Sequence, residues 1–361
     1  MKIGFDGRCL LDDKLSGVGK YATYTLKEMI NENPLDEFVV FASSFGGKNL
    51  ENLSWLKKKP NVKLKIWRIP NKLLNLCFFL FNWPKMDFFT GTVDIFFMPN
   101  INFCALSKKN KNVLTIHDLS FEYFERFFSF KMRLWHFLVN PRRICRQCDE
   151  LIAVSESTKE DLVNFYQINP EKISVAKKKK INSLIRFGLK KISEDNEEDL
   201  EAAKFVRDTY GLPERFILFL GNLEPRKNIV SVVLAFEELK MSNQRFVDLN
   251  LVLVGGNRWL NEELATLIKE SAFRENIFLV GYIKDDDRKM IYRSAKVFVY
   301  PSFFEGYGYP PIEALILDVP VIASNNTSLA ENLQTKAVLI DAFRPDEIRL
   351  ALETLLEPSA G

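Results

Sequence analysis

The chain has 361 residues, a length that predicts two domains, and a hydrophobic content of 47% that is sufficient to fill two cores. Its 50 basic and 47 acidic residues leave a net charge of +3, so the composition gives no support to a nucleic-acid partner. Five cysteines, no early signal-like segment and no uncharged apolar run longer than 73–84 favour a cytoplasmic protein with reduced thiols and no spanning helix, which takes about 20 residues.

The first half of the chain alternates between strand-like and helix-like patterns. Short apolar runs separated by helical periodicity predict a parallel sheet covered by helices, the α/β class. The expected strands are 2–5, 38–42, 62–69, 94–98, 113–116, 150–154 and 173–176.

A glycine turn follows the first expected strand and precedes a helix expected over 20–31. Its residues include Gly17, Gly19, Lys20 and Tyr21. Free backbone N–H groups at such a helix start are an anion site. A P-loop does not fit, because Lys14 and Tyr21 stand where that motif has Gly and Ser or Thr.

His117 stands at the end of the strand expected over 113–116. In open α/β sheets, ligands gather at the carboxyl ends of strands, so His117 is placed for chemistry. The other histidine, His136, lies between Trp135 and Phe137 in a helical run and is expected to be structural.

The segment 126–148 is basic and aromatic. It holds six Lys and Arg residues and no acid, interleaved with Phe and Trp. Two interpretations stay open. The segment lies on an anionic membrane surface, or it is an ordinary helix of the first domain with a solvated basic side. The apolar stretch 73–81 either packs in the core or lines an acceptor site.

A change of composition predicts the connection between two domains. Residues 177–180 are four lysines, and 194–201 contains six acids. We therefore expect a first domain at 1–176, a linker at 177–209 and a second domain at 210–344. A final helix in 345–361 either stays with the second domain or crosses back to the first.

The second half repeats the strand, turn and helix pattern. Arg226 and Lys227 lie between the strand expected over 216–220 and the helix expected over 229–240. Cations and backbone dipoles at this position stabilise a developing anion, although both side chains would also suit an exposed turn. Asp285 and Asp287 form an Asp-x-Asp sequence, but they open a helix, where capping explains acids without a metal.

The most informative stretch is 301–314, between the strand expected at 297–300 and the helix that begins near 312. Glu305 is placed on the loop and Glu313 in the first turn of the helix. Gly306 and Gly308 allow close backbone approach, and the helix start favours an anion. Two carboxylates that accept paired hydroxyl groups flank this phosphate cradle.

Glu-x7-Glu with Gly-Tyr-Gly between the acids resembles the retaining glycosyltransferases of family GT4. The Gly-x-Gly-Lys-Tyr turn at 17–21 and the Leu-Glu-Pro-Arg-Lys-Asn turn at 223–228 agree with this resemblance. The resemblance implies the GT-B fold, an α/β architecture of two Rossmann-like domains whose parallel sheets face each other across a cleft. It also implies a nucleotide-sugar donor.

The resemblance assigns roles to individual residues. It implies that Glu313 holds the donor ribose, Glu305 the transferred sugar, and Lys227 with Arg226 the diphosphate. His117 would contact the donor sugar. The remaining donor-binding candidates are turn and loop residues on both domains: Gly17, Gly19, Gly221, Asn222, Gly255, Tyr282, Gly306, Tyr307 and Gly308.

The function that the resemblance implies is transfer of a hexose to a glycan or lipid-linked acceptor in envelope polysaccharide or glycolipid synthesis. GDP-mannose is the first expectation for the donor and a UDP-hexose the second. No metal and no further cofactor are expected, and the enzyme would work in the cytoplasm or on the inner face of the membrane. The alternatives are a donor-binding partner subunit without activity and a sugar-nucleotide epimerase.

Overall fold

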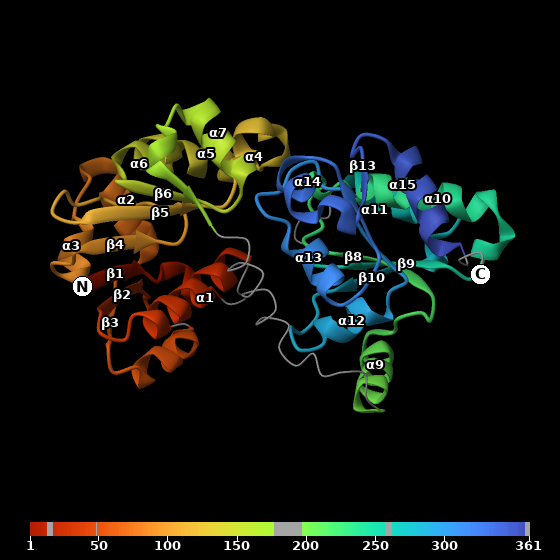
Figure 1. Ribbon diagram of the computed structural model, residues 1–361, viewed down its shortest axis with the longest axis horizontal. Helices are drawn as coiled ribbons and strands as arrows, with labels where there is room; N and C mark the ends of the chain where they lie inside the picture. Colours follow the sequence, from red (N-terminus) through yellow and green to blue (C-terminus); the bar gives the residue numbers. More distant parts are fainter. Residues whose placement is uncertain (13–16, 48, 177–196, 257–261, 358–361) are drawn as a thin grey trace. The chain divides into compact units, whose positions relative to one another are not determined.

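The computed structural model describes residues 1–12, 17–47, 49–176, 197–256 and 262–357 (Figure 1). The chain divides into two compact units, Met1–Lys177 and Lys178–Gly361. Each unit has its own parallel sheet, which confirms the predicted α/β class with two Rossmann-like domains. The lysine run 177–180 and the acids at 194–196 lie outside the described residues.

The sheet of unit 1 has seven parallel strands in the order β3-β2-β1-β4-β5-β6-β7. The order reverses beside β1, and such a switch point is where α/β sheets hold ligands. The strands are β1 (Lys2–Asp6), β2 (Glu37–Ser43), β3 (Val62–Trp67), β4 (Ile95–Met98), β5 (Lys111–Ile116), β6 (Glu150–Ala153) and β7 (Ile173–Val175).

Both faces of this sheet are covered. In β2, Val39 and Phe41 pack into one apolar cluster, whereas Phe38 and Val40 pack into the other, as the period of two in a strand requires. The first cluster lies under α2 (Asn71–Phe81), α3 (Met86–Thr90), α5 (Phe130–Val139), α6 (Pro141–Gln147) and α7 (Glu156–Tyr166). The second lies under α1 (Gly17–Glu32), on the opposite side of the sheet in Figure 1.

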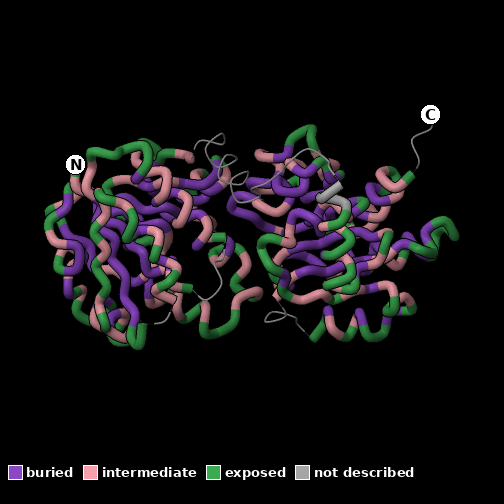
Figure 2. Tube along the Cα trace, turned by 90° about the horizontal axis from the view of Figure 1, so that it is seen from below, coloured by how far each residue is buried: buried purple, intermediate pink, exposed green. Residues whose placement is uncertain are grey.

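The other described helices of unit 1 are short. They are α4 (Ser120–Tyr123) and the 3-10 helices Arg8–Leu11, Leu50–Lys58, Glu125–Phe127 and Pro170–Lys172. In both units the inner strands of the sheet are buried, whereas the edge strands β3, β7, β10 and β13 are only partly buried. Figure 2 shows buried segments in the middle of each unit and exposed segments around them.

The sheet of unit 2 has six parallel strands in the order β10-β9-β8-β11-β12-β13. Its order reverses between β8 and β11, so the turns after these two neighbouring strands meet at one edge. The strands are β8 (Phe216–Leu220), β9 (Asn250–Val254), β10 (Ile277–Gly281), β11 (Val297–Tyr300), β12 (Val321–Ser324) and β13 (Val338–Ile340).

Helices cover the sheet of unit 2. They are α9 (Glu197–Tyr210), α10 (Ile229–Ser242), α11 (Glu262–Glu270), α12 (Arg288–Ser294), α13 (Tyr309–Ile316), α14 (Thr327–Leu333) and α15 (Pro345–Leu356), with 3-10 helices at Pro225–Lys227, Gln244–Phe246, Arg274–Asn276 and Gln334–Lys336. α15 packs on α10 and β13, so the described part of the final helix lies within unit 2.

Part of the expected linker is a helix. α9 occupies 197–210 and packs against α12, and its Val206 is buried. The hydroxyl group of Tyr210 donates to Asp287 Oδ2 at 2.6 Å and accepts from the backbone N–H of Lys284 at 3.1 Å. These contacts attach the helix to unit 2. The sequence predicted a linker here because 194–201 is rich in acids, although the helix also has apolar residues on one side.

Candidate functional site

The loop between β11 and α13 has the backbone geometry that the motif predicts. Gly308 is the N-cap of α13, with φ of 82°, and Pro residues occupy the first turn. A Cβ atom at Gly308 would lie 2.4 Å from Leu329 Cδ2, so glycine is needed for space as well as conformation. Because α13 begins at Tyr309, Glu313 lies one turn deeper in the helix than the sequence predicted.

Lys227 and Glu305 form a buried ion pair in unit 2. Lys227 Nζ lies 2.5 Å from Glu305 Oε1 and 2.7 Å from the hydroxyl oxygen of Tyr300, and both charged side chains are 9% exposed. Burial lowers the pKa of the Lys227 ammonium, against the opposing effect of Glu305. Burial alone would raise the pKa of Glu305, but the attraction of Lys227 and Arg226 lowers it, so Glu305 is a carboxylate at neutral pH.

Arg226 joins this pair from the same turn. Its guanidinium donates to Glu224 Oε1 at 2.8 Å and to the carbonyl oxygen of Phe304, and it lies 3.6 Å from Glu305 Oε2. The backbone N–H of Phe303 also donates to the carbonyl of Arg226 at 2.9 Å. The structure therefore brings together Arg226, Lys227 and Glu305, which lie on two turns far apart in the sequence.

Glu313 is held by two residues of α12. The hydroxyl group of Tyr292 donates to Glu313 Oε2 at 2.9 Å, and Arg288 forms an ion pair with the same oxygen. Burial alone would lower the pKa of Arg288, but Glu313 and Tyr292 raise it. Sequence reasoning missed both partners. The sequence feature that could have indicated them is the spacing of Arg288 and Tyr292, which lie four residues apart and so share one face of a helix.

The predicted donor-binding glycines lie along the carboxyl edge of the sheet of unit 2. The backbone N–H of Gly221 donates to Val254, and that of Gly255 donates to Gly281, each at 2.9 Å. A Cβ atom on Gly255 would lie 1.8 Å from the carbonyl oxygen of Gly221, so the two turns touch backbone to backbone. Asn222 follows Gly221 and is exposed.

The two predicted tyrosines of unit 2 differ. Tyr282 follows the turn at Gly281 and is 53% exposed, so its ring is available to a ligand. Tyr307, between Gly306 and Gly308, is buried against Tyr309, with ring centroids 5.2 Å apart. Its carbonyl oxygen accepts from Asn332 Nδ2 at 2.8 Å. The aromatic ring of Tyr307 thus belongs to the packing of the loop.

In unit 1, α1 begins at Gly17, so Gly17 and Gly19 both lie in its first turn. Tyr21 links this helix to the end of β5. Its ring meets the edge of His117 at 4.9 Å, and its hydroxyl lies 3.3 Å from Thr115 Oγ1. The glycine turn and His117 are therefore neighbours within unit 1.

His117 has a defined hydrogen-bonding state. Its Nε2 lies 2.8 Å from the carbonyl oxygen of Pro99, which accepts only. Burial lowers the pKa of the imidazole, despite the opposing effects of Pro99 and Asp118. The neutral ring thus carries its proton on Nε2, which leaves Nδ1 as the acceptor.

Among the described residues, no three His, Cys, Asp or Glu side chains are grouped to hold a metal ion. Asp287 accepts from Tyr210 and Asp285 lies 3.9 Å from Arg288, so both acids of the Asp-x-Asp sequence have partners. None of the described helices combines the length and the apolar character that crossing a bilayer requires.

Comparison with known proteins covers both units. Residues 15–177 match the family model described as Glycosyltransferase Family 4, and residues 204–359 match the model described as Glycosyl transferases group 1. The O-antigen chain mannosyltransferase B of Escherichia coli is 25% identical over 92% of this chain and 85% of its own length. The serotype-specific mannosyltransferase WbdA of Escherichia coli is 27% identical over 62% of this chain, a match that spans only 26% of WbdA.

The solved structures agree with this chain in fold. The crystal structure of HepE from Anabaena in complex with UDP and glucose aligns with a TM-score of 0.66 and 15% identity, over 99% of this chain and 90% of HepE. This likeness shows the GT-B fold. The two family models and the mannosyltransferase relatives place the chain in family GT4 of the retaining glycosyltransferases, enzymes that transfer hexoses.

Proposed function

We propose that this enzyme transfers mannose from GDP-mannose to a glycan or lipid-linked acceptor in the synthesis of an envelope polysaccharide. The observation that carries the proposal is the cluster of Arg226, Lys227 and Glu305 beside the N-terminus of α13. The mannosyltransferase names of the two Escherichia coli relatives support mannose as the sugar. The UDP complex of HepE makes a UDP-hexose the competing donor.

The two cations would stabilise the leaving group. As the glycosidic bond breaks, a nucleoside diphosphate gains negative charge, and fixed cations in a water-poor site stabilise that charge strongly. Lys227 is buried and Arg226 is held in place by Glu224, so neither side chain must reorganise during the reaction. The positive charge that a metal would supply is then present in the protein, and we expect transfer without a metal ion.

The two acids of the motif would hold the hydroxyl groups of the donor. Glu305 would accept hydrogen bonds from the transferred hexose. Glu313 would accept from the ribose, with its orientation fixed in advance by Tyr292 and Arg288. Each carboxylate can accept paired hydroxyl groups, which suits a vicinal diol.

The reaction would proceed on one face of the sugar. The bond from the anomeric carbon to the diphosphate oxygen breaks, the bond to the acceptor oxygen forms on the same side, and the leaving phosphate oxygen takes the acceptor proton. In unit 1, Nδ1 of the neutral His117 would accept a hydrogen bond from the donor sugar, and the first turn of α1 at Gly17 and Gly19 would face phosphate. We propose that the reaction takes place on the cytoplasmic side of the membrane, which the basic segment 126–148 would contact.

A panel of nucleotide sugars tests this proposal. GDP-mannose should raise the apparent melting temperature of the full chain more than UDP-glucose or UDP-N-acetylglucosamine, because ligands that bind the native state stabilise it. Mass spectrometry of the same donor with lipid-linked and oligosaccharide acceptors should then detect a product heavier by one hexose.

Three outcomes would contradict the proposal. Stabilisation by UDP-hexoses alone would show that the donor is a UDP-hexose and not GDP-mannose. Donor binding with no product from any acceptor would favour a partner subunit without activity. Conversion of the donor to an epimer in the absence of acceptor would favour a sugar-nucleotide epimerase.

A further inference from the structure

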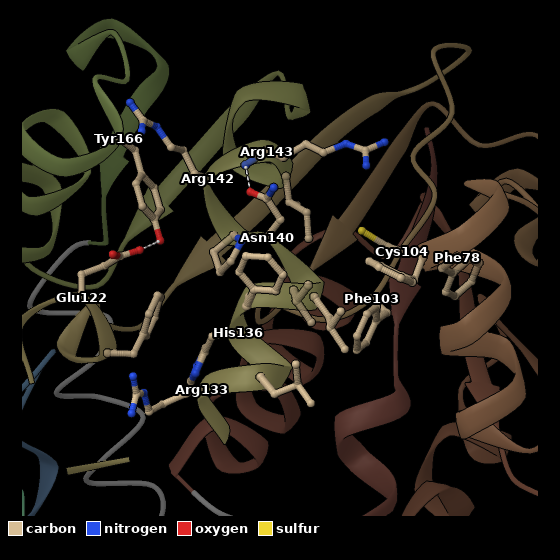
Figure 3. A pocket seen from close by; sticks show the side chains of 18 of the residues that line it. Phe78, Phe103, Cys104, Glu122, Arg133, His136, Asn140, Arg142, Arg143 and Tyr166 are labelled. Carbon is tan, nitrogen blue, oxygen red and sulfur yellow. Dashed lines mark hydrogen bonds between the residues drawn. The ribbon is translucent and has the colours of Figure 1, made fainter. Parts of the chain in front are cut away.

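Unit 1 contains a cavity of about 810 Å³ between α2, α5, α6 and the end of α7 (Figure 3). Its size is in the range of small-molecule sites, roughly 300–1,000 Å³. Aromatic side chains make up much of its lining: Phe78, Phe103, Phe121, Phe128, Phe130 and Phe137. None of these residues belongs to the donor site proposed above, so the cavity needs a separate explanation.

The cavity opens onto an exposed apolar surface. Phe130 and Phe137 are each 79% exposed, and Leu134 and Phe79 are 44% exposed, yet all four also line the cavity. α2 continues this surface with Leu73, Leu76, Leu80 and Phe81, all at least half exposed. Monomeric proteins rarely leave such a patch open to water, because covering each large side chain is worth about 1.5–3 kcal/mol.

Three arginines and two glutamates line the cavity. Glu125 is paired with Arg133, and Glu122 accepts from the hydroxyl group of Tyr166 at 2.7 Å. Arg142 and Arg143 are exposed, line the cavity and form no ion pair within the part of the chain that the structure describes. An anionic group at the edge of the cavity would be complementary to these two cations.

The sequence explains why aromatic and basic side chains meet here. α5 ends at Val139, its C-cap Asn140 has φ of 52°, and Pro141 starts α6 directly afterwards. The side chain of Asn140 accepts from the backbone N–H of Arg143 at 3.0 Å and caps the new helix. This break places the arginines beside the aromatic face of α5. Figure 3 shows Arg142 and Arg143 extending from α6 in different directions.

We propose that this cavity binds the lipid chain of a phosphate-linked or diphosphate-linked acceptor, with the phosphate at Arg142 or Arg143. A concave aromatic site accepts one apolar chain, and the exposed aromatic residues around it give a chain a path of entry. This inference rests on the proposed transferase function and specifies its acceptor as an amphiphile. It also gives a role to the open apolar face of α2.

Equilibrium dialysis of the full chain with radiolabelled farnesyl phosphate, below the concentration at which it forms micelles, tests the inference. Farnesyl phosphate should bind, farnesol should bind more weakly, and inorganic phosphate should not compete. Phe137→Ser should weaken binding by roughly tenfold or more, the effect of losing one large apolar contact. Replacing Arg142 and Arg143 together by Ser should abolish the preference for farnesyl phosphate over farnesol.

Matched controls come from unit 2. Phe205 on α9 is 68% exposed and Arg274 is exposed, so Phe205→Ser and Arg274→Ser make the same chemical changes away from the cavity. Equal binding by the cavity variants and these controls would overturn the inference. So would the absence of farnesyl phosphate binding.

Two further results would assign the face to another occupant and so also overturn the inference. One is binding to phosphatidylglycerol vesicles that depends on Phe137, without binding of monomeric farnesyl phosphate. The other is a dimer in sedimentation that Phe137→Ser dissociates. Thermal stabilisation by GDP-mannose, measured on the same variants, separates the two proposals. If GDP-mannose stabilises the protein but farnesyl phosphate does not bind, only the lipid site fails. If farnesyl phosphate binds but GDP-mannose does not stabilise the protein, the lipid site stands and the assignment of GDP-mannose as donor fails.

Discussion

The ammonium group of Lys227 and the carboxylate of Glu305 lie 2.5 Å apart although 78 residues separate them in the sequence. They meet because β8 and β11 are neighbours at the switch point of the sheet, and each residue lies on the turn that follows its strand. Both side chains are buried, so each charge depends on the other for compensation.

Replacing Glu305 by Gln should lower both activity and stability. The amide keeps a hydrogen-bond acceptor but leaves Lys227 without its nearest opposite charge, which should cost about 3 kcal/mol of unfolding free energy. Because the folded-state pKa of Glu305 is below its usual 4.5, the contribution of the carboxylate is fully present above that value and is lost as pH falls through the folded pKa. Urea unfolding of both proteins should therefore show a difference near neutral pH that shrinks in acid; a constant difference would contradict the pairing.

Replacing Arg288 by Leu should impair donor binding more than catalysis. The change leaves Tyr292 as the remaining contact from α12 to Glu313, so the carboxylate is less firmly oriented toward a ribose. We expect the KM for the donor to rise roughly tenfold with kcat within about threefold of the original. Tyr292→Phe, which removes one neutral hydrogen bond, should have a smaller effect in the same steady-state assay. An unchanged KM in the Arg288 variant would contradict the role of Glu313 in donor binding.

Two adjacent glycines provide a matched pair of variants. Gly255→Ala places a methyl group 1.8 Å from the carbonyl of Gly221, whereas a methyl group at Gly256 has nothing within 4 Å. Gly255→Ala should therefore force the turns after β8 and β9 apart and destabilise the protein by roughly 2–4 kcal/mol, in the range of severe substitutions. Gly256→Ala should change the unfolding free energy by less than about 0.5 kcal/mol. Equal effects would mean that these turns are not in backbone contact.

Local patterns in the sequence were sufficient for the parts of the fold that depend on neighbouring residues. The alternation of apolar runs predicts both parallel sheets, and the pattern of 301–314, with Gly306 and Gly308, predicts the loop and helix that carry Glu305 and Glu313. The sequence pattern did not show at which residue α13 starts. Pro310 and Pro311 suit the first turn of a helix, so the helix begins at Tyr309 and Glu313 lies deeper in it.

Contacts between distant elements could not be predicted. Nothing local connects Arg288 with Glu313, because their pairing depends on how α12 and α13 pack. The cavity of unit 1 depends on the angle between α5 and α6, which the break at Asn140 sets. α9 did leave a signal: Ala203, Val206 and Tyr210 recur at helical spacing, but the surrounding acids favoured a linker.

The half-buried imidazole of His117 should affect stability below neutral pH. Burial holds its folded-state pKa below the usual 6.5, so the unfolded chain binds the proton first as pH falls. Stability is therefore fully present above pH 6.5 and declines between that value and the folded pKa, by about 1.4 kcal/mol for each unit of separation. His117→Gln can still donate to Pro99 and does not titrate, so its unfolding free energy should decline less over this range. If the unfolding free energies of the wild type and the His117→Gln variant declined equally with falling pH, His117 would not be held neutral in the folded protein.

The most direct test of the account is the rate of mannose transfer from GDP-mannose by the Lys227→Met variant, measured with and without a chelator. Lys336→Met, an exposed lysine of the same unit, is the control for the substitution. If the buried lysine stabilises the leaving diphosphate, kcat should fall by at least about tenfold in the Lys227 variant alone, and the chelator should not change the wild-type rate. A full rate in the Lys227 variant together with loss of activity in chelator would contradict the account.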